Sequence, residues 1–485
     1  MNDNSFQEGC KPDTCQPRVN EVSPGERKTT KDDITMNQRI TKPYIRKNGQ
    51  LVEVPFEEAF QYIGQKIQKP ETNNTLVMTS GSYSNETLYL LQRFARTVLN
   101  TNALGSFDYY RRGIDFFADK NDILPFAEMF QSDKIYCIFP PVETRRAASL
   151  HPLETSVETH DRASLQIPET LKAVHEILNR CPDTPKYWFN TSDTLNITDY
   201  YAFFRSVNFY LIQHHLEKGI YVEVLGKNYG TYKEALLADD YDALLRKNNL
   251  QDADIQTFVD DLVKIPAPAF IVWERWLTEG GFHELENLCM LLDVQSKPAA
   301  GFLTIKGELN SQGLFDMGMF PHIAPGGHKM TEKRQEKMAE VLGVPVCAEP
   351  IDVPAALDRT AFRNVLLWNA LGAEIPQDIA NQVEKAEFSM LQTVCLPDNA
   401  DCYDVILPAN LPEEISGTYT DTTKVPHQYV TESGNLLEYN NLQQIAKLAD
   451  TFGFDTFPQT PDEVFLEYIS FMEAGCHSAE RHFFR

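Results

Sequence analysis

The sequence of 485 residues lacks the features that mark membrane and secreted proteins. It contains no run of about 18 apolar residues, so we do not expect a transmembrane helix. The N-terminal 33 residues are polar and charged without an apolar centre, which excludes a secretory signal peptide. Hydrophobic residues make up 42% of the chain, as in soluble globular proteins. The sequence therefore predicts a cytoplasmic protein, either free or held at the inner face of the membrane by partners.

Basic charge is also scarce. The chain has 44 Lys and Arg residues against 69 Asp and Glu residues, which gives a formal net charge of −25. Nucleic acids and anionic membrane surfaces select for basic faces, so neither is an expected partner. A solvated acidic surface is a sufficient explanation for the excess.

The glycine patterns that bind phosphate groups are missing. There is no Walker-type loop, and no G-x-G-x-x-G follows an expected strand. The segment TLVMTSGSYSNETL (75–88) reads as strand, loop and helix, and free N–H groups at the helix start could hold an anion. Alternatively, Ser82 or Ser84 simply caps this helix.

A complete cysteine motif for a metal cluster is absent as well. Cys10 and Cys15 could be a fragment of an iron–sulfur site, but no second close pair follows them. Cys476, His477 and His482 offer another weak metal site, although an exposed tail explains them better. Cys10 and Cys15 are therefore only weak metal candidates.

Three further cysteines, Cys137, Cys289 and Cys395, lie inside apolar runs, which predicts buried thiols. The first 37 residues are polar and predict a flexible arm. After them, Asn48-Gly49 marks a hairpin turn, and Pro55 opens a helix.

What the chain does contain is a long alternation of strands and helices. Strands are expected at 75–81, 133–139, 185–190, 267–276, 363–370, 388–396 and 403–409. Helices are expected at 82–99, 169–180, 199–216, 232–246, 254–264, 281–292, 331–342, 377–386, 440–452 and 461–474. This alternation is typical of parallel sheets covered by helices on both faces, so the predicted fold class is α/β with two doubly wound domains.

We expect the following division of the chain. It consists of an arm at 1–37, a first domain formed by 38–132 and 301–474, a second domain inserted at 133–300, and a tail at 475–485.

Two segments lie where ligands of open α/β sheets bind, beyond the carboxyl ends of strands. LNSQGLFDMGMFPHIAPGG (309–327) has four Gly and two Pro, so it cannot be a long helix or a central strand. Its apolar residues make it unlike a solvated linker. DVILPANLPEEISGTYTDT (404–422) ends a strand and begins a new extended segment. On spacing alone, structural turns explain both segments equally well.

Four stretches together resemble the molybdopterin oxidoreductase superfamily, in particular formate dehydrogenase large subunits and the large NADH-quinone oxidoreductase (complex I) subunit. They are RITKPYIRKNGQLVEVPFEEAFQYI (39–63), SGSYSNETLYLLQRFARTVLNTNALGS (80–106), GELNSQGLFDMGMFPHIAPGG (307–327) and DVILPANLPEEISGTYTDT (404–422). Their order and spacing agree with the family from about 38 to 470.

This resemblance implies two interleaved Rossmann-like domains and, in an active member, molybdopterin guanine dinucleotide with molybdenum or tungsten. The same resemblance implies that the cofactor would be contacted by Asn310, Gln312, Gly313, Asp316, Gly318, Glu414, Gly417 and Thr418.

The departures from the family pattern concern the metal first. The family's four-cysteine module is represented only by Cys10 and Cys15. No Cys or His lies between 101 and 113, where members carry the metal ligand, and Tyr110 or Arg111 stands in its place. The domain that covers the nucleotide tail often follows position 470, whereas this chain ends at 485.

Other departures concern the space for a pterin. Trp273 and Trp276 stand where relatives tend to have glycine, and YWFNTSDT (187–194) lacks the family's Asp-Pro-Arg. We therefore predict a scaffold or accessory subunit of a complex I-like redox assembly, without cofactor and with other subunits as partners. On this hypothesis the NSQGLFDMG loop packs against protein, with Asp316 hydrogen-bonded inside.

Two alternatives stay open. One is a molybdenum or tungsten bis-pterin oxidoreductase of the formate dehydrogenase kind, with Ser106 or Asp108 as metal ligand and the cluster supplied by partner chains. The other is a small-ligand binding module that retains a remodelled crevice between the domains.

Overall fold

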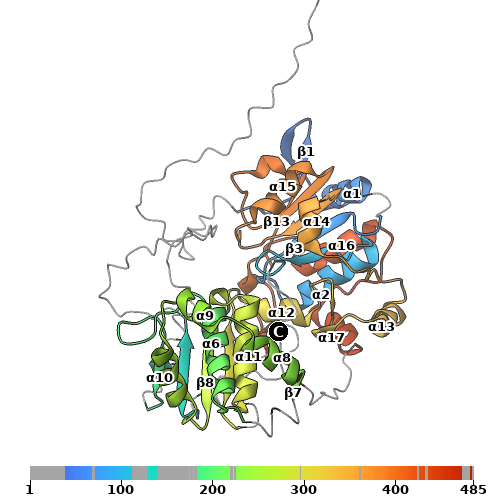
Figure 1. The fold of residues 1–485 in the computed structure, drawn as a ribbon. Helices are drawn as coiled ribbons and strands as arrows, with labels where there is room; N and C mark the ends of the chain where they lie inside the picture. Colours follow the sequence, from blue (N-terminus) through green and yellow to red (C-terminus); the bar gives the residue numbers. More distant parts are fainter. Residues whose placement is uncertain are drawn as a thin grey trace, which may run out of the picture. The chain divides into compact units, whose positions relative to one another are not determined.

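The structure is a computed structural model (Figure 1). It describes residues 39–67, 71–111, 129, 131–139, 174, 178–179, 183–218, 222, 226–294, 297–359, 362–422, 425–431, 435–471 and 481–482. The expected arm with Cys10 and Cys15, most of the expected helix at 169–180, and Cys476 and His477 lie outside these residues.

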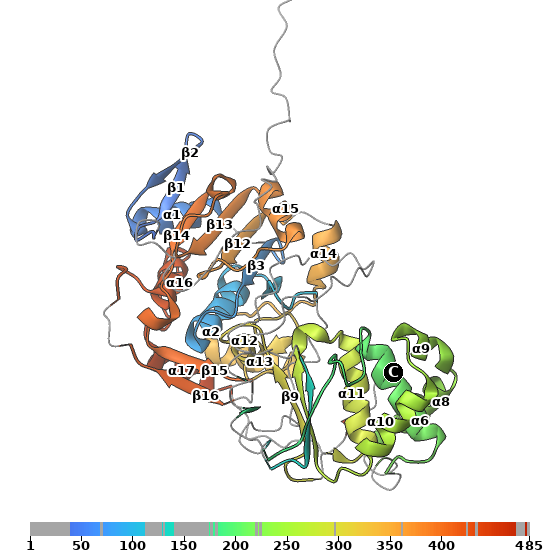
Figure 2. The ribbon, with the colours of Figure 1, turned by 90° about the vertical axis from the view of Figure 1, so that its left-hand side faces the viewer.

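The larger sheet has seven strands in the order β2-β1-β14-β13-β12-β3-β4 (Figure 2). Five of them, from β14 to β4, are parallel, and the hairpin β1-β2 adds antiparallel to β14. The strands are β1 (Tyr44–Lys47), β2 (Gln50–Glu53), β3 (Thr75–Thr79), β4 (Leu104–Ser106), β12 (Asn364–Trp368), β13 (Phe388–Thr393) and β14 (Val405–Pro408). Strand order reverses between β3 and β12, which places a topological switch point beside the carboxyl end of β3.

The central strands β3, β12, β13 and β14 are buried on both faces, as their continuous apolar runs predicted. Along β12, Val365 and Leu367 belong to one hydrophobic cluster and Leu366 and Trp368 to another, so successive side chains alternate between two cores. Helices α1 (Phe56–Lys66), α2 (Asn85–Arg93) and α16 (Asn441–Thr451) contribute to the second cluster. Helices α14 (Val353–Arg359) and α15 (Gln377–Lys385) contribute to the first. The α/β doubly wound class is confirmed.

The smaller sheet has four parallel strands in the order β6-β5-β8-β9. They are β5 (Lys134–Ile138), β6 (Lys186–Trp188), β8 (Pro268–Trp273) and β9 (Gly301–Ile305). Tyr136 and Phe270 stack on one face with ring centroids 5.1 Å apart, while Cys137 and Ile271 face the opposite cluster. These strands come from the chain between β4 and β12, so the two sheets are interleaved in sequence. The expected domain boundaries stay a prediction. Strand β9, which begins at the expected boundary between residues 300 and 301, pairs within the smaller sheet.

The remaining elements connect or cover the sheets. Helices around the smaller sheet are α6 (Tyr200–Gln213), α8 (Tyr229–Leu237), α9 (Tyr241–Lys247), α10 (Asp252–Leu262) and α11 (Glu279–Leu291). The others are α12 (Ser311–Asp316), α13 (Glu332–Leu342), α17 (Pro461–Ile469), β7 (Gly226–Lys227), β10 (Ile323–Ala324), β11 (His328–Lys329), β15 (Gly417–Thr420), β16 (Pro426–Tyr429) and β17 (Arg481–His482). No helix in the described part of the chain is long and apolar enough to span a bilayer.

Two local expectations are wrong for identifiable reasons. The single helix expected at 232–246 is two helices, because the Asp240 side chain accepts a hydrogen bond from the backbone of Ala243 and starts α9. Cys395 is only partly buried because it follows the end of β13, whereas Cys137 and Cys289 are buried as expected. The Asn48-Gly49 hairpin is confirmed, with φ of 53° and 81° at the two turn residues.

A buried charge network joins the helices beside the smaller sheet. The carboxylate of Glu284 on α11 is 1% exposed and accepts hydrogen bonds from Arg205 (2.6 Å), Asn208 (2.8 Å) and the Tyr232 hydroxyl (2.6 Å). Three helices thus converge on one carboxylate. Removing its charge would leave a buried guanidinium with a weaker partner.

We expect Glu284→Gln to lower the free energy of unfolding by about 1–3 kcal/mol, because Arg205 loses one of its two carboxylate partners and keeps only Asp239. Urea denaturation followed by circular dichroism measures this loss. Glu279→Gln, at an exposed position of the same helix, is the matched control. Equal losses in the two variants would contradict the assignment of Glu284 as the hub of these helices.

Candidate functional site

Charged and aromatic side chains follow the carboxyl ends of strands from both sheets. Gly81 follows β3, Asp108 and Tyr109 follow β4, Glu274 follows β8, and Glu308 follows β9. Hydrogen bonds and one ion pair connect these segments. Ligands of open α/β folds bind at such ends, so this is the candidate site.

Glu308, in the loop after β9, contacts the start of the β3–α2 loop. Its Oε2 accepts a hydrogen bond from the backbone N–H of Gly81. Burial raises the pKa of Glu308 to about 8, and the negative charge of Asp108 acts in the same direction. Ser84 caps α2 by accepting from the N–H of Thr87 (3.4 Å), which confirms the capping interpretation. A side chain of the protein itself therefore stands where an external anion would approach this loop.

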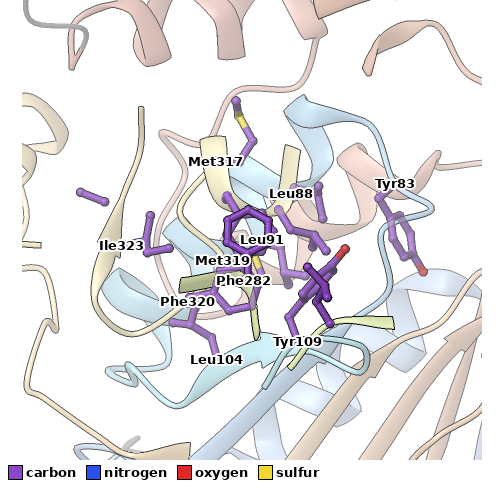
Figure 3. Packing of buried hydrophobic residues seen from close by; sticks show 14 of the residues in the cluster. Tyr83, Leu88, Leu91, Leu104, Tyr109, Phe282, Met317, Met319, Phe320 and Ile323 are labelled. Carbon is purple, nitrogen blue, oxygen red and sulfur yellow. The ribbon is translucent and has the colours of Figure 1, made fainter. Parts of the chain in front are cut away.

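Tyr109 connects the segment after β4 with the segments after β8 and β9. Its hydroxyl donates to Glu274 Oε1 at 2.5 Å, and the same oxygen accepts from the N–H of Gly307 at 3.0 Å. Its ring lies edge-on to Phe315, with centroids 5.0 Å apart, and 6.3 Å from Phe320 (Figure 3). The segment expected to carry a metal ligand thus contributes an aromatic side chain to a hydrophobic cluster.

The neighbours of Tyr109 point elsewhere. Tyr110 and Arg111, the two residues that stand in place of the family's metal ligand, both bind Asp378 on α15, at 2.6 and 2.7 Å. Asp108 instead pairs with Arg275 at 3.1 Å. Among the residues that the structure describes, no group of three or more His, Cys, Asp or Glu side chains is placed to hold a metal ion.

The two tryptophans expected to take up pterin space lie at the end of β8 and just after it. Trp273 and Trp276 are half-buried, with ring centroids 6.3 Å apart. Trp276 also stacks on Tyr200 of α6 at 6.3 Å. Trp276 therefore contributes to the packing between β8 and α6, whereas Trp273 packs against the hydrophobic cluster on the opposite face of the sheet.

Asn310 is the centre of a buried polar network. Its Nδ2 donates to the carbonyl of Tyr83 (2.8 Å) and to Asn85 Oδ1 (3.0 Å), and its Oδ1 accepts from the N–H of Thr420 (2.8 Å). Its own N–H donates to the carbonyl of Gly81 at 2.7 Å. One amide side chain thereby joins the β3–α2 loop, the loop before α12 and strand β15.

Glu86 binds the N-terminal end of β15, opposite to the end that Asn310 binds. Its carboxylate accepts from the N–H and the hydroxyl of Thr418, at 3.0 and 2.8 Å. Asn85 Nδ2 donates to the hydroxyls of Thr418 (3.1 Å) and Thr420 (2.8 Å). The first turn of α2 therefore binds β15 entirely through side chains that are buried.

Two glycines make this approach possible. A Cβ at Gly417 would lie 2.8 Å from the Cβ of Ser84, and a Cβ at Gly313 would overlap the amide oxygens of Asn85 and Asn310. Both positions need glycine because neighbouring protein atoms leave no room for a Cβ. A closely bound ligand would impose the same requirement.

The remaining residues that the family resemblance implied as cofactor contacts lie outside this polar network. Gln312 Nε2 donates to Asp316 Oδ1 at 2.9 Å within α12, and Asp316 is half-buried rather than enclosed. Gly318 has a φ of 80°, which glycine tolerates best. Glu414 accepts from the N–H of Leu411 at 3.0 Å and so stabilises the turn before β15. The structure brings Asn310, Gly313, Gly417 and Thr418 together in one network. 

The buried side chain of Arg96 holds the loop after α12 through hydrogen bonds. Its side chain is 1% exposed and donates to the carbonyls of Gly318, Phe320 and Ile323 at 2.8–3.0 Å. The side chains of Gln92 and Asn102 accept its remaining hydrogen bonds. Burial lowers the pKa of Arg96 to about 9. Every N–H of the guanidinium is thus directed at a protein oxygen.

Sequence reasoning did not identify Glu274, Glu308, Arg275 or Arg96 as parts of this site. The first three could have been found, because each is a charged residue within three positions of the end of a buried strand. Arg96 carries no such signal, since it lies in the middle of a helical pattern.

The chain is similar in sequence to several known proteins. Residues 39–122 match the family described as molybdopterin oxidoreductase. The Bacillus subtilis protein "Putative formate dehydrogenase YrhE" is 23% identical over 428 residues, covering 81% of this chain and 41% of its own length. The alpha subunit of F420-dependent formate dehydrogenase 2 from Methanococcus maripaludis is 24% identical over 414 residues, covering 80% and 58%. The resemblance to molybdopterin oxidoreductases is confirmed.

A solved structure shares the fold. Acetylene hydratase from Pelobacter acetylenicus superposes with a TM-score of 0.61 at 13% sequence identity, covering 90% of this chain and 64% of that one. The chain thus spans less than two thirds of this structure and of the curated relatives it matches.

We expect Gly313→Ala to destabilise the protein by about 1–3 kcal/mol, because the added methyl overpacks the Asn85–Asn310 contact. Urea unfolding measures the change. Gly230→Ala on α8 is the control, since a Cβ there meets nothing within 4 Å. A Gly313→Ala variant as stable as this control would show that the network is loosely packed.

The pKa of Glu308 predicts a pH dependence of stability. Because its folded pKa of about 8 exceeds its ordinary value of 4.5, its contribution is fully present below pH 4.5 and is lost as the pH rises towards 8. Between pH 5 and 8.5 the wild-type protein should therefore lose about 1–3 kcal/mol more unfolding free energy than Glu308→Gln.

Urea titrations at several pH values provide the measurement. Glu336→Gln, at an exposed carboxylate of α13, should retain the wild-type slope. Identical slopes for wild type and Glu308→Gln would rule out a buried carboxyl at this position.

Proposed function

We propose that this chain, whose residues 39–122 match the molybdopterin oxidoreductase family, is a non-catalytic scaffold or accessory subunit of a redox assembly related to formate dehydrogenase or complex I. The observation that carries the proposal is that the polar groups at the strand ends are bound to one another. Glu308 binds the β3–α2 loop, Tyr109 binds Glu274, and Asp108 binds Arg275. 

The residues present do not fit a pterin dinucleotide at this position. Asn310 and Gly313 belong to the loop that would approach it, yet the amide of Asn310 is committed to Tyr83, Asn85 and Thr420. Three carboxyl groups, those of Asp108, Glu274 and Glu308, occupy the strand ends, where they bind Arg275, the Tyr109 hydroxyl and the N–H of Gly81. Occupancy would therefore require these contacts to be rebuilt.

A second candidate function is a molybdenum or tungsten bis-pterin oxidoreductase subunit of the formate dehydrogenase kind. It is supported by the names of the relatives and by the retained family residues Asn310, Gly313, Gly417 and Thr418. Its metal would need Ser106 or Asp108 as ligand. However, Ser106 is fully buried, and Asp108 is paired with Arg275. We retain the scaffold function as the proposal because of these contacts at the strand ends.

The scaffold proposal includes other redox subunits as partners and a cytoplasmic location, either free or peripheral at the inner face of the membrane. One relative is itself named as an alpha subunit. Direct contact with nucleic acid is not part of the proposal, because the net charge is −25.

Tyr109→Phe distinguishes the two functions. It removes the hydroxyl that binds Glu274 at the strand ends while keeping the ring that packs on Phe315. We expect a stability loss of about 1 kcal/mol and unchanged turnover of the isolated assembly, since the hydroxyl only closes the site. A loss of turnover of about 100-fold or more would instead indicate acid–base catalysis at this position.

The assembly itself is tested by purifying the tagged chain under native conditions and weighing the particles by mass photometry. We expect a stoichiometric complex with redox subunits. A free monomer in both cytosol and membrane extracts would contradict a scaffold function, and a thermal shift with small metabolites would then favour the ligand-binding module.

A further inference from the structure

Helix α17 has an apolar face that is exposed to solvent. Phe465, Leu466 and Ile469 are 59%, 66% and 42% exposed, so three large apolar side chains lie within five residues. On the opposite side of the helix, Val464 is buried and Glu467 faces α2. Such a concentration of exposed large apolar side chains on one short helix is typical of interaction surfaces.

The orientation of this face is fixed. Glu467 accepts from the Tyr89 hydroxyl at 2.6 Å and pairs with Arg93 at 2.8 Å, and both donors belong to α2. At the start of α17, Thr460 and Glu463 form a reciprocal capping box. The helix therefore cannot rotate to bury Phe465 and Leu466 without breaking a half-buried ion pair.

The chain segment that carries this face is acidic. Asp455, Asp462 and Glu463 are exposed at and before the helix start, and no Lys or Arg occurs from 448 to 471. A second copy of the chain would bring the same acidic rim against this one, and each copy carries a net charge of −25. Like charges opposed across an interface disfavour association, so self-pairing through α17 is not expected.

We propose that α17 is the docking site for an amphipathic helix of another polypeptide, with apolar residues at helical spacing and Lys or Arg along its flanks. The apolar residues would cover Phe465, Leu466 and Ile469, and the basic flanks would meet the acidic rim. The proposal deepens the scaffold function by naming the chemistry of a partner, but it does not depend on the state of the strand-end site.

The test places a photo-crosslinking residue in the full-length chain at position 466 (Leu466→benzoylphenylalanine) in the native cell. Mass spectrometry then identifies the linked peptide. We expect a segment of a different polypeptide that has apolar residues at i, i+3 or i+4 with basic neighbours. Adding Phe465→Ser should reduce the cross-link at least about tenfold, because the removal of one central anchor typically weakens an interface that much.

Leu371, which is 50% exposed in the turn after β12, is the matched control position for the cross-linker. A yield at position 466 no higher than at position 371 would overturn the proposal. So would links to a second copy of this chain or to an acidic segment. Molybdenum content does not affect this outcome, so the docking surface and the scaffold function fail by different measurements.

Discussion

The fold at the strand ends depends on one constraint, which is that buried backbone groups must find hydrogen-bond partners. Asn310 meets this constraint for three segments at once, because its amide binds Tyr83, Asn85 and the N–H of Thr420. Without it, the β3–α2 loop and β15 would each have an unpaired buried group, at a cost of about 1–3 kcal/mol apiece. The network is therefore the structural centre of this region.

The same chemistry explains how the family resemblance and the proposed lack of a cofactor can coexist. A loop that binds a pterin needs amide side chains and glycines that allow close approach. A loop that binds protein backbone needs the same residue types, as the close contacts of Gly313 and Gly417 demonstrate. Retention of these residues is thus compatible with either use. At the strand ends, the carboxyl groups and Tyr109 bind other groups of the same chain. These contacts favour the use of the retained residues for binding protein backbone.

Sequence patterns predicted the layers of the fold better than the contents of the site. Buried strands such as β12 have continuous apolar runs, and helix starts have capping residues, so both could be located without a structure. The break at Asp240 was missed because a capping aspartate inside a helical pattern is not distinctive. The choice of Tyr109 over Tyr110 could not be predicted, since it depends on how the backbone turns after β4. The position of Glu308 depends on the approach of a strand from the other sheet.

We propose that the strand-end site is closed by its own side chains and carries no pterin or metal. The most direct test is elemental and pterin analysis of the intact protein purified from its native source. The account predicts molybdenum and tungsten well below one atom per chain and no pterin released on acid oxidation. One atom of either metal per chain, together with stoichiometric pterin, would contradict it.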